Sequence, residues 1–198
     1  MREKLTSLDV NKYILKSIKP QYVHLIKSNL KNVELMTTPP KVNLDFGHLV
    51  VYVYETKSNW LKPYYNSITG KDYFVEYPGC GKVVGYFECN KIGKATWNEE
   101  LKKYDIPKNW KMGITESELE KYGYKDGKQR TIYGLEFECF RPFSFPIFLQ
   151  RFTKVPDCTY CIRFKEQQKR FDDCDACKRF RFVSRPPQSF MFVEKFKE

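Results

Sequence analysis

Four cysteines near the C-terminal end constrain the fold of this 198-residue chain more than any other feature. They form two C-x-x-C pairs, Cys158/Cys161 and Cys174/Cys177, with twelve residues between the pairs. Each pair can present two thiolates to one ion, and the intervening loop can bring the second pair round. The spacing therefore predicts a structural zinc ion. All-thiolate sites also accept iron, so the choice between the two metals stays open.

The same pattern argues against a catalytic metal. Catalytic zinc keeps one coordination position open, whereas four thiolates close the shell. Zinc nucleobase deaminases combine P-C-x-x-C with H-x-E, yet His24 is followed by Leu-Ile and His48 by Leu-Val. The phosphate-binding, metalloprotease, serine-hydrolase and dinucleotide fingerprints are absent as well. For the remaining thiols, Cys80, Cys89 and Cys139, we expect buried positions and no reactivity.

The charge of the chain indicates its partners. The formal net charge is +11, and a basic surface favours polyanions such as nucleic acid. Aromatic residues alternate with cations around the cysteines, which suits phosphate contact and base stacking. We therefore predict that nucleic acid contacts Arg163, Lys169, Arg170, Lys178, Arg179, Arg181 and Arg185. The alternatives are a solvated basic face and aromatic side chains that pack the small zinc module.

Composition predicts one globular domain over residues 1–198, with residues 151–184 as a zinc-stapled basic insert. No apolar run reaches the roughly 18 residues of a membrane-spanning helix, and residues 1–12 lack the apolar centre of a signal peptide. We therefore expect no membrane association and a cytoplasmic protein.

Residue patterns predict several strands and two short helices. The first helix starts at Pro20, with Val23, Ile26 and Leu30 at helical spacing and Asn29 as a left-handed residue near its end. The second has Thr115 as N-cap, Glu118 at the third position and Gly123 as terminator. We expect strands at 13–19, 31–41, 48–56, 82–92 (bulged at Gly85), 129–140 and 186–196, with a loop or hairpin at 66–82. The order lacks regular βαβ alternation, which favours a small α+β barrel.

Three segments, in this order, resemble ASCH domains, which belong to the PUA-like barrels. SIKPQYVHLIKSNLKNVEL is similar to the opening strand, helix and G-x-K-x-x-E segment of the family. VVYVYETK and GKVVGYFECNKI are similar to its central strands. RPPQSFMFVE resembles the RPPQSW-x-x-V strand of a phage and bacterial variant with a cysteine-containing insert. The resemblance implies a PUA-like β-barrel with a cleft and a role in RNA metabolism.

Some members of that family resemble amidohydrolases that remove the acyl group of N4-acylcytidine. These use a lysine, a residue three positions later and a glutamate before the second helix. Lys31 matches the lysine, and Glu34 stands where the hydrolases have a threonine. The third position falls within residues 109–113, which hold no carboxylate; Glu99 and Glu100 lie upstream.

Lys31 and Glu34 are accordingly the candidate catalytic or ligand-contacting pair. A lysine acts as a base or nucleophile only if its pKa is lowered, and a neighbouring Glu34 raises that pKa. A salt bridge that holds a base or a phosphate is the other possibility, and Glu88 is a lower-ranked carboxylate.

The preferred interpretation is a binding module that takes RNA, in preference to DNA, or a modified nucleotide. It would use Lys31 together with the basic residues around the zinc site. An amidohydrolase, another RNA-modifying or nuclease activity, and a protein–protein adaptor remain the alternatives.

Overall fold

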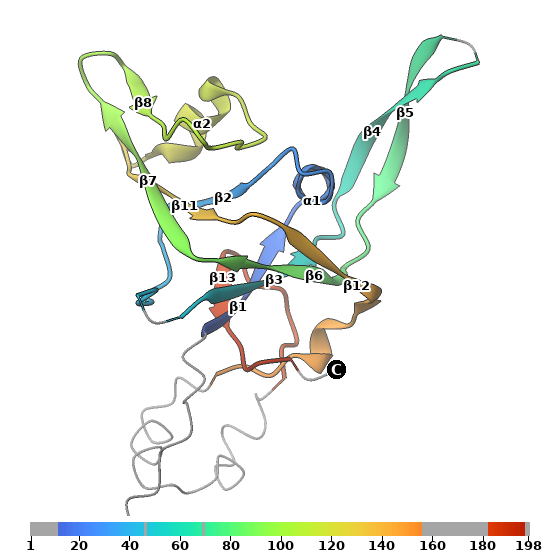
Figure 1. The fold of residues 1–198 in the computed structure, drawn as a ribbon. Helices are drawn as coiled ribbons and strands as arrows, with labels where there is room; N and C mark the ends of the chain where they lie inside the picture. Colours follow the sequence, from blue (N-terminus) through green and yellow to red (C-terminus); the bar gives the residue numbers. More distant parts are fainter. Residues whose placement is uncertain (1–11, 46, 69, 156–181, 197–198) are drawn as a thin grey trace, which may run out of the picture.

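Strands dominate the chain in a computed structural model, which describes residues 12–45, 47–68, 70–155 and 182–196. The helices are α1 (Pro20–Lys27), α2 (Glu116–Gly123) and a 3-10 turn, η1 (Leu149–Arg151). The strands are β1 (Lys12–Ile18), β2 (Val33–Met36), β3 (Leu49–Glu55), β4 (Asn59–Asn66), β5 (Lys71–Pro78), β6 (Lys82–Cys89), β7 (Lys91–Asn98), β8 (Lys103–Asp105), β9 (Tyr124–Lys125), β10 (Lys128–Gln129), β11 (Ile132–Glu136), β12 (Phe140–Ile147) and β13 (Phe190–Phe192). Figure 1 shows their arrangement.

The central sheet has five strands in the order β12-β6-β3-β1-β13. β1 and β3 pair in parallel, from Lys12 opposite Leu49 to Ile18 opposite Glu55, and the other pairs are antiparallel. A parallel pair needs a crossover, and α1 lies in this one. As predicted, Pro20 opens α1, and Asn29 just beyond its end has a left-handed φ of 56°.

Both faces of this sheet are buried at β1 and β3. Alternate residues of a strand point to opposite faces. One face of β1 and β3 contributes Ile14, Ile18, Val51 and Val53 to a core that includes α1. The other face contributes Tyr13, Leu15, Val50, Tyr52 and Tyr54 to a second core. All seven residues of β3 are buried, which explains why its first six form a continuous run of apolar and aromatic residues before Glu55.

A second sheet has the order β2-β11-β7-β8. β7 continues from β6 with only Asn90 between them, so one stretch of chain serves both sheets (Figure 1). A third core, which includes Leu119 of α2, Trp110 and Leu35 of β2, packs on this sheet. The predicted capping box of α2 is confirmed, with Thr115 and Glu118 bonded to each other's backbone N–H.

The predicted α+β class is confirmed, but the described strands do not close into a barrel. They form separate hydrogen-bonded sheets. Closure requires the edge strands to pair along their length, whereas edge strands β13 and β2 have only three and four residues. The predicted bulge is present, because the β3–β6 register shifts beside Gly85.

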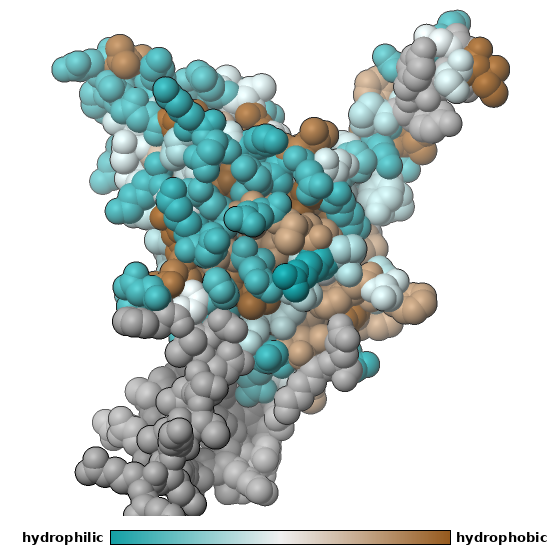
Figure 2. All heavy atoms as spheres, viewed as in Figure 1, coloured by the Kyte–Doolittle hydropathy of each residue, from teal (hydrophilic) through white to brown (hydrophobic). Residues whose placement is uncertain are grey.

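β4 and β5 form a two-stranded ribbon that projects from the body (Figure 1). Hydrophobic residues are visible on this arm in Figure 2.

Two predictions for single residues are wrong: Leu30 is exposed because α1 ends at Lys27, and Cys139 is exposed on the surface. Cys89 is buried as expected and Cys80 is half-buried. In the described ranges, no helix is long and apolar enough to cross a membrane.

Candidate functional site

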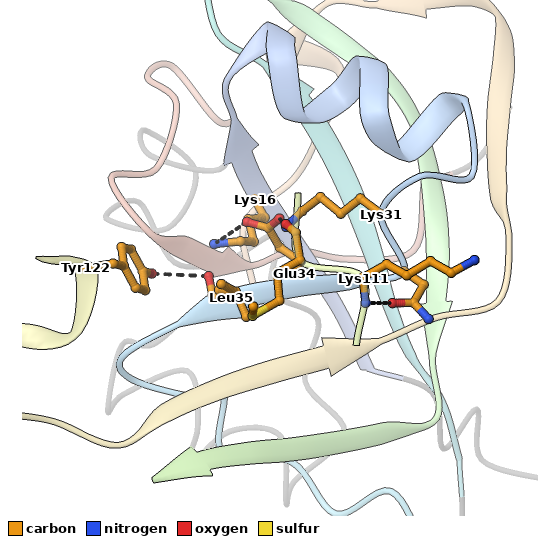
Figure 3. Close-up of polar contacts among 8 residues, drawn as sticks. Lys16, Lys31, Glu34, Leu35, Lys111 and Tyr122 are labelled. Carbon is orange, nitrogen blue, oxygen red and sulfur yellow. Dashed lines mark hydrogen bonds and ion pairs between the residues drawn. The ribbon is translucent and has the colours of Figure 1, made fainter. Parts of the chain in front are cut away.

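The carboxylate of Glu34 lies between two lysine ammonium groups (Figure 3). Lys16 Nζ is 3.4 Å from Glu34 Oε1, and Lys31 Nζ is 3.5 Å from Glu34 Oε2. The side chains of Lys16 and Lys31 are 7% and 3% exposed, and that of Glu34 is 11% exposed. Solvent screens buried charges weakly. The three residues therefore act as one unit, the Lys16–Glu34–Lys31 cluster, with a formal charge of +2 − 1 = +1.

Strand alternation explains why these side chains meet. Lys16 shares a face of β1 with Ile14 and Ile18, which belong to the core beside α1. Glu34 shares a face of β2 with Met36, which belongs to the same core. Both charged side chains consequently enter the layer where the two sheets meet, and they neutralise part of each other's charge there.

Lys31 reaches the cluster from the loop that follows α1. Its ammonium group donates to the backbone carbonyl of Met112 at 2.6 Å. Gly113, next in the chain, has φ 72°, and a Cβ there would lie 2.6 Å from Leu25 Cδ1. Glycine at this position therefore permits the close approach that aims the Met112 carbonyl at Lys31.

Hydrogen bonds of the Asn32 side chain connect the segment before α2 to the strands. The backbone N–H of Lys111 donates to Asn32 Oδ1 at 2.7 Å (Figure 3). Asn32 Nδ2 donates to the carbonyl of Asn109 at 3.0 Å. Asn109 Nδ2 in turn donates to Glu136 Oε2 on β11 at 2.9 Å. The segment 109–113 is thus held beside Lys31, which it contacts through the Met112 carbonyl.

Two tyrosines border the cluster. The Tyr122 hydroxyl donates to the carbonyl of Leu35 at 3.2 Å, and Lys31 Nζ lies 5.6 Å from the centre of the Tyr22 ring. Burial and the nearby Glu34 charge raise the pKa of Tyr122 to about 12. Burial, Glu118 and Glu34 also raise the pKa of Tyr22. Both hydroxyls therefore stay protonated at neutral pH: that of Tyr122 donates to Leu35, and that of Tyr22 can donate to a further acceptor.

Burial dominates the titration of Lys31. Desolvation lowers the pKa of Lys31, and Lys16 lowers it further, while the charge and hydrogen bond of Glu34 oppose the shift. The sequence argument that Glu34 raises the pKa of Lys31 is confirmed for the contribution of Glu34. The net shift is nevertheless downward, because burial lowers the pKa by more than Glu34 raises it.

The other candidate carboxylates lie elsewhere. Glu99 and Glu100 lie in the exposed turn between β7 and β8, where Glu99 pairs with Lys102 at 3.0 Å. Glu88 pairs with Arg141 at 3.7 Å. It lies on the face of β6 opposite to Phe87 and Cys89, which point into the core beside α1. Glu88 therefore does not share a core face with Glu34.

Lys16 and Tyr122 are the members of the site that the sequence interpretation missed. A signal for Lys16 was available, because it alternates with Ile14 and Ile18 on what had to be the buried face of a strand. Tyr122 carried no such signal, since its contact with Leu35 spans 87 positions.

Most of the predicted basic contacts and all four predicted zinc ligands lie outside the described residues. These are Cys158, Cys161, Cys174, Cys177, Arg163, Lys169, Arg170, Lys178, Arg179 and Arg181. Arg185 is described and is exposed. Within the ranges that the structure covers, no group of three or more His, Cys, Asp or Glu residues could hold a metal ion.

The two ends of the predicted insert are described, and they belong to the core. Phe152 and Val183 are both buried in the second core. The Val183 N–H donates to the Phe152 carbonyl at 3.0 Å, and Thr153 forms an antiparallel bridge with Phe182. The described residues on the two sides of 156–181 therefore lie next to each other.

Comparison with solved structures finds the same architecture in ASCH proteins of Zymomonas mobilis. A crystal structure of a serine-to-alanine variant has a TM-score of 0.50 and 17% identity, and the match covers 95% of this chain and 92% of that chain. A tyrosine-to-phenylalanine variant has a TM-score of 0.49, also at 17% identity, over 93% and 91% of the two chains. No protein-family model matches the sequence, and no curated protein matches it.

The chain therefore has an α+β fold similar to that of an ASCH protein. This confirms the ASCH-type fold that the three sequence segments predicted, but not the closed barrel expected with it, because the described strands form separate sheets. At 17% identity to the ASCH protein of Zymomonas mobilis, the likeness concerns the fold alone.

Proposed function

We propose that the chain is a nucleic-acid-binding module that takes RNA, in preference to DNA, or a modified nucleotide at the Lys16–Glu34–Lys31 cluster. The observation that carries this proposal is the excess positive charge of a buried cluster. Two ammonium groups share one carboxylate, so one positive charge lacks a counter-ion within the trio. A buried unpaired charge is unfavourable, and an anionic or carbonyl oxygen of a ligand offsets it.

The groups around the cluster suit a ligand rich in acceptors. Tyr22 offers a protonated hydroxyl, and Lys111 is exposed on the segment that contacts Lys31. Phosphate oxygens and base carbonyls are acceptors of this kind. The net charge of +11 and the ASCH-type fold support RNA as the ligand.

Two substitutions at the cluster should act in opposite directions. Labelled single-stranded and duplex RNA and DNA would be titrated at two salt concentrations, with fluorescence anisotropy as the readout. Lys31→Met should weaken RNA binding about 5- to 10-fold, whereas Glu34→Gln should strengthen it because the cluster then carries a further positive charge. Lys103→Met, an exposed lysine on β8, is the control for loss of one charge.

A purely structural ion cluster gives a different result. Whatever the change in unfolding temperature, the affinity of the folded protein would then equal that of the control for both substitutions. That outcome contradicts the proposal.

A second candidate, hydrolysis of an N4-acylated cytidine, is favoured by the lowered pKa of Lys31. A deprotonated lysine can accept a proton from water as it adds to the acyl carbon, after which cytidine and a carboxylic acid are released. Glu34 replaces the threonine of the hydrolases, and the Met112 carbonyl cannot relay a proton as a carboxylate does. Release of cytidine from N4-acetylcytidine by the wild type, abolished in Lys31→Met, would support this candidate. A wild type without turnover would exclude it for this substrate.

We further propose that Cys158, Cys161, Cys174 and Cys177 bind one structural zinc ion. The close approach of the insert ends fits this arrangement. Cys158 follows Val155 by three positions, and Cys177 precedes Phe182 by five. Because Thr153 and Phe182 are paired, each C-x-x-C pair starts from neighbouring points of the domain. Bound zinc would hold the ends of the basic loop together.

A further inference from the structure

The projecting β4–β5 ribbon has a surface that the proposed cluster does not use. Its eight residue pairs run without a register shift from Asn59 opposite Pro78 to Asn66 opposite Lys71. Every residue of β5 is exposed. An isolated two-stranded ribbon is marginally stable in water, so the exposure of this many apolar side chains calls for a functional explanation.

The register divides the charges of the ribbon between its two faces. Directly paired residues share a face, and neighbours along a strand alternate. One face, which we call the aromatic–cationic face, carries Trp60, Lys62, Lys71, Tyr73, Val75 and Tyr77. Opposite to it lie Leu61, Pro63, Asp72, Phe74 and Glu76. Both lysines of the two strands thus share one face with aromatic side chains, and both carboxylates share the other.

The base of the aromatic–cationic face is fixed to the domain. Trp60 lies with its ring centre 5.2 Å from that of His24 on α1 and 6.2 Å from that of Tyr77. The Tyr77 hydroxyl donates to Glu55 Oε1 of β3 at 3.4 Å. These contacts orient the aromatic rings before any ligand arrives, which reduces the entropy that binding must remove.

The positive charge of this face continues onto α1. Burial lowers the pKa of His24, and the nearby charges of Lys62 and Lys27 lower it further. His24 is therefore neutral at physiological pH, and the cations beside Trp60 are Lys62 from the ribbon and Lys27 from α1.

We propose that the aromatic–cationic face binds single-stranded nucleic acid, with bases stacked on its aromatic rings and phosphates at Lys62 and Lys71. Every base has a π face, so stacking on protein aromatics tolerates any sequence, and lysines at the edges of such a platform track the backbone. A duplex hides the faces of its bases, so it should bind this surface more weakly. The inference rests on the proposed nucleic-acid function and adds its strand type and a second contact surface.

A pair of adjacent residues provides a matched test. Tyr73 and Phe74 follow each other on β5, are 44% and 67% exposed, and lie on opposite faces. Affinity for a labelled 12-nucleotide single-stranded RNA and for the DNA of the same sequence would be measured by anisotropy. Tyr73→Ala should weaken binding about 5- to 100-fold, the value of one stacked base, and Phe74→Ala should change it less than twofold.

A double substitution tests the phosphate contacts. Lys62→Met/Lys71→Met should reduce the slope of log affinity against log salt by about 1.4, at about 0.7 for each phosphate contact with a single strand. Lys103→Met/Lys125→Met removes the same charge from β8 and β9 and should leave the slope nearly unchanged. Circular dichroism would verify that all variants are folded.

The outcomes separate this proposal from the one on the buried cluster. If Tyr73→Ala and Phe74→Ala bind equally while Lys31→Met and Glu34→Gln still shift affinity in opposite directions, the ribbon proposal is overturned and the cluster proposal stands. If Tyr73→Ala loses affinity while Phe74→Ala, Lys31→Met and Glu34→Gln bind like the wild type, the ribbon proposal stands and the cluster proposal is overturned. If neither nucleic acid binds and sedimentation shows dimers that both ribbon variants dissociate, the ribbon is a self-association surface and the proposal is wrong.

Discussion

Lys31 donates to the backbone carbonyl of Met112 at 2.6 Å, and the two residues are 81 positions apart. This bond joins the loop after α1 to the segment that leads into α2. It also fixes the ammonium group next to Glu34. One lysine therefore holds two distant parts of the chain together and orients the central carboxylate of the candidate site.

We expect Lys31→Met to lower the free energy of unfolding by about 2–4 kcal/mol, because the Met112 carbonyl and Glu34 each lose a buried partner. Urea unfolding would measure the change. Lys111→Met is the matched control, since Lys111 is exposed and bonds to Asn32 through its backbone N–H. It should change stability by less than about 0.5 kcal/mol. Equal effects of the two substitutions would show that the Lys31 contacts do not stabilise the fold.

Stability at high pH should depend on Cys89. Burial raises the pKa of the Cys89 thiol to about 11, from the 9.0 of an exposed thiol. Between these values the folded protein retains a proton that the unfolded chain releases, so stability falls as pH rises. From pH 8 to 10.5 the titration of Cys89 should lower the free energy of unfolding by about 2 kcal/mol.

Cys89→Ala removes the titrating thiol. The cavity that the substitution leaves also lowers stability, but by an amount that does not depend on pH. Urea unfolding of both proteins at pH 8 and 10.5 isolates the contribution. The wild type should lose about 2 kcal/mol more than the variant over this interval. If the wild type and the variant lost the same stability over this interval, the Cys89 thiolate would form in the folded protein without unfolding.

The strands that residue patterns predicted correctly are those in which local preference and burial agree. β3 is an apolar, β-branched run buried on both faces, and β6 has a glycine where its register shifts. β4 and β12 escaped prediction because Pro63 and Pro142 argue against strands. Both strands are edges of their sheets, where a missing backbone donor can face away from the ladder.

Only part of the candidate site could be predicted from the sequence. Lys31 and Glu34 are three positions apart, so the pair could be predicted from a short segment. Its other members come from β1 and from the segment before α2, and only the pairing of distant elements brings them together. The pKa of Lys31 could not be predicted for the same reason, since it depends on burial by residues remote in the chain.

The capping box of α2 should contribute measurably to stability. Glu118 N–H donates to Thr115 Oγ1 at 3.2 Å, and Thr115 N–H donates to Glu118 Oε2 at 2.8 Å. Thr115→Ala removes the first bond and should cost about 1 kcal/mol. Ser117→Ala, within the first turn of the same helix, should be neutral or slightly stabilising because alanine favours helix. Thermal unfolding of the two variants would compare them, and a neutral Thr115→Ala would contradict a stabilising cap.

The zinc proposal predicts one zinc ion per chain in protein purified without chelators, measured by elemental analysis. Cys158→Ser should abolish or sharply reduce the metal content, because a structural zinc site needs all four ligands. Cys139→Ser is the matched control: its thiol is exposed and lies outside both C-x-x-C pairs, so the metal content should stay at one. Removing zinc with a chelator should open the basic loop and weaken RNA binding, while the cores built on β1 and β3 keep the domain folded.

Iron in place of zinc would change the metal but leave the four-thiolate site intact. Wild-type protein without any metal that still binds RNA as tightly as a zinc-supplemented sample would show that the cysteines have another role.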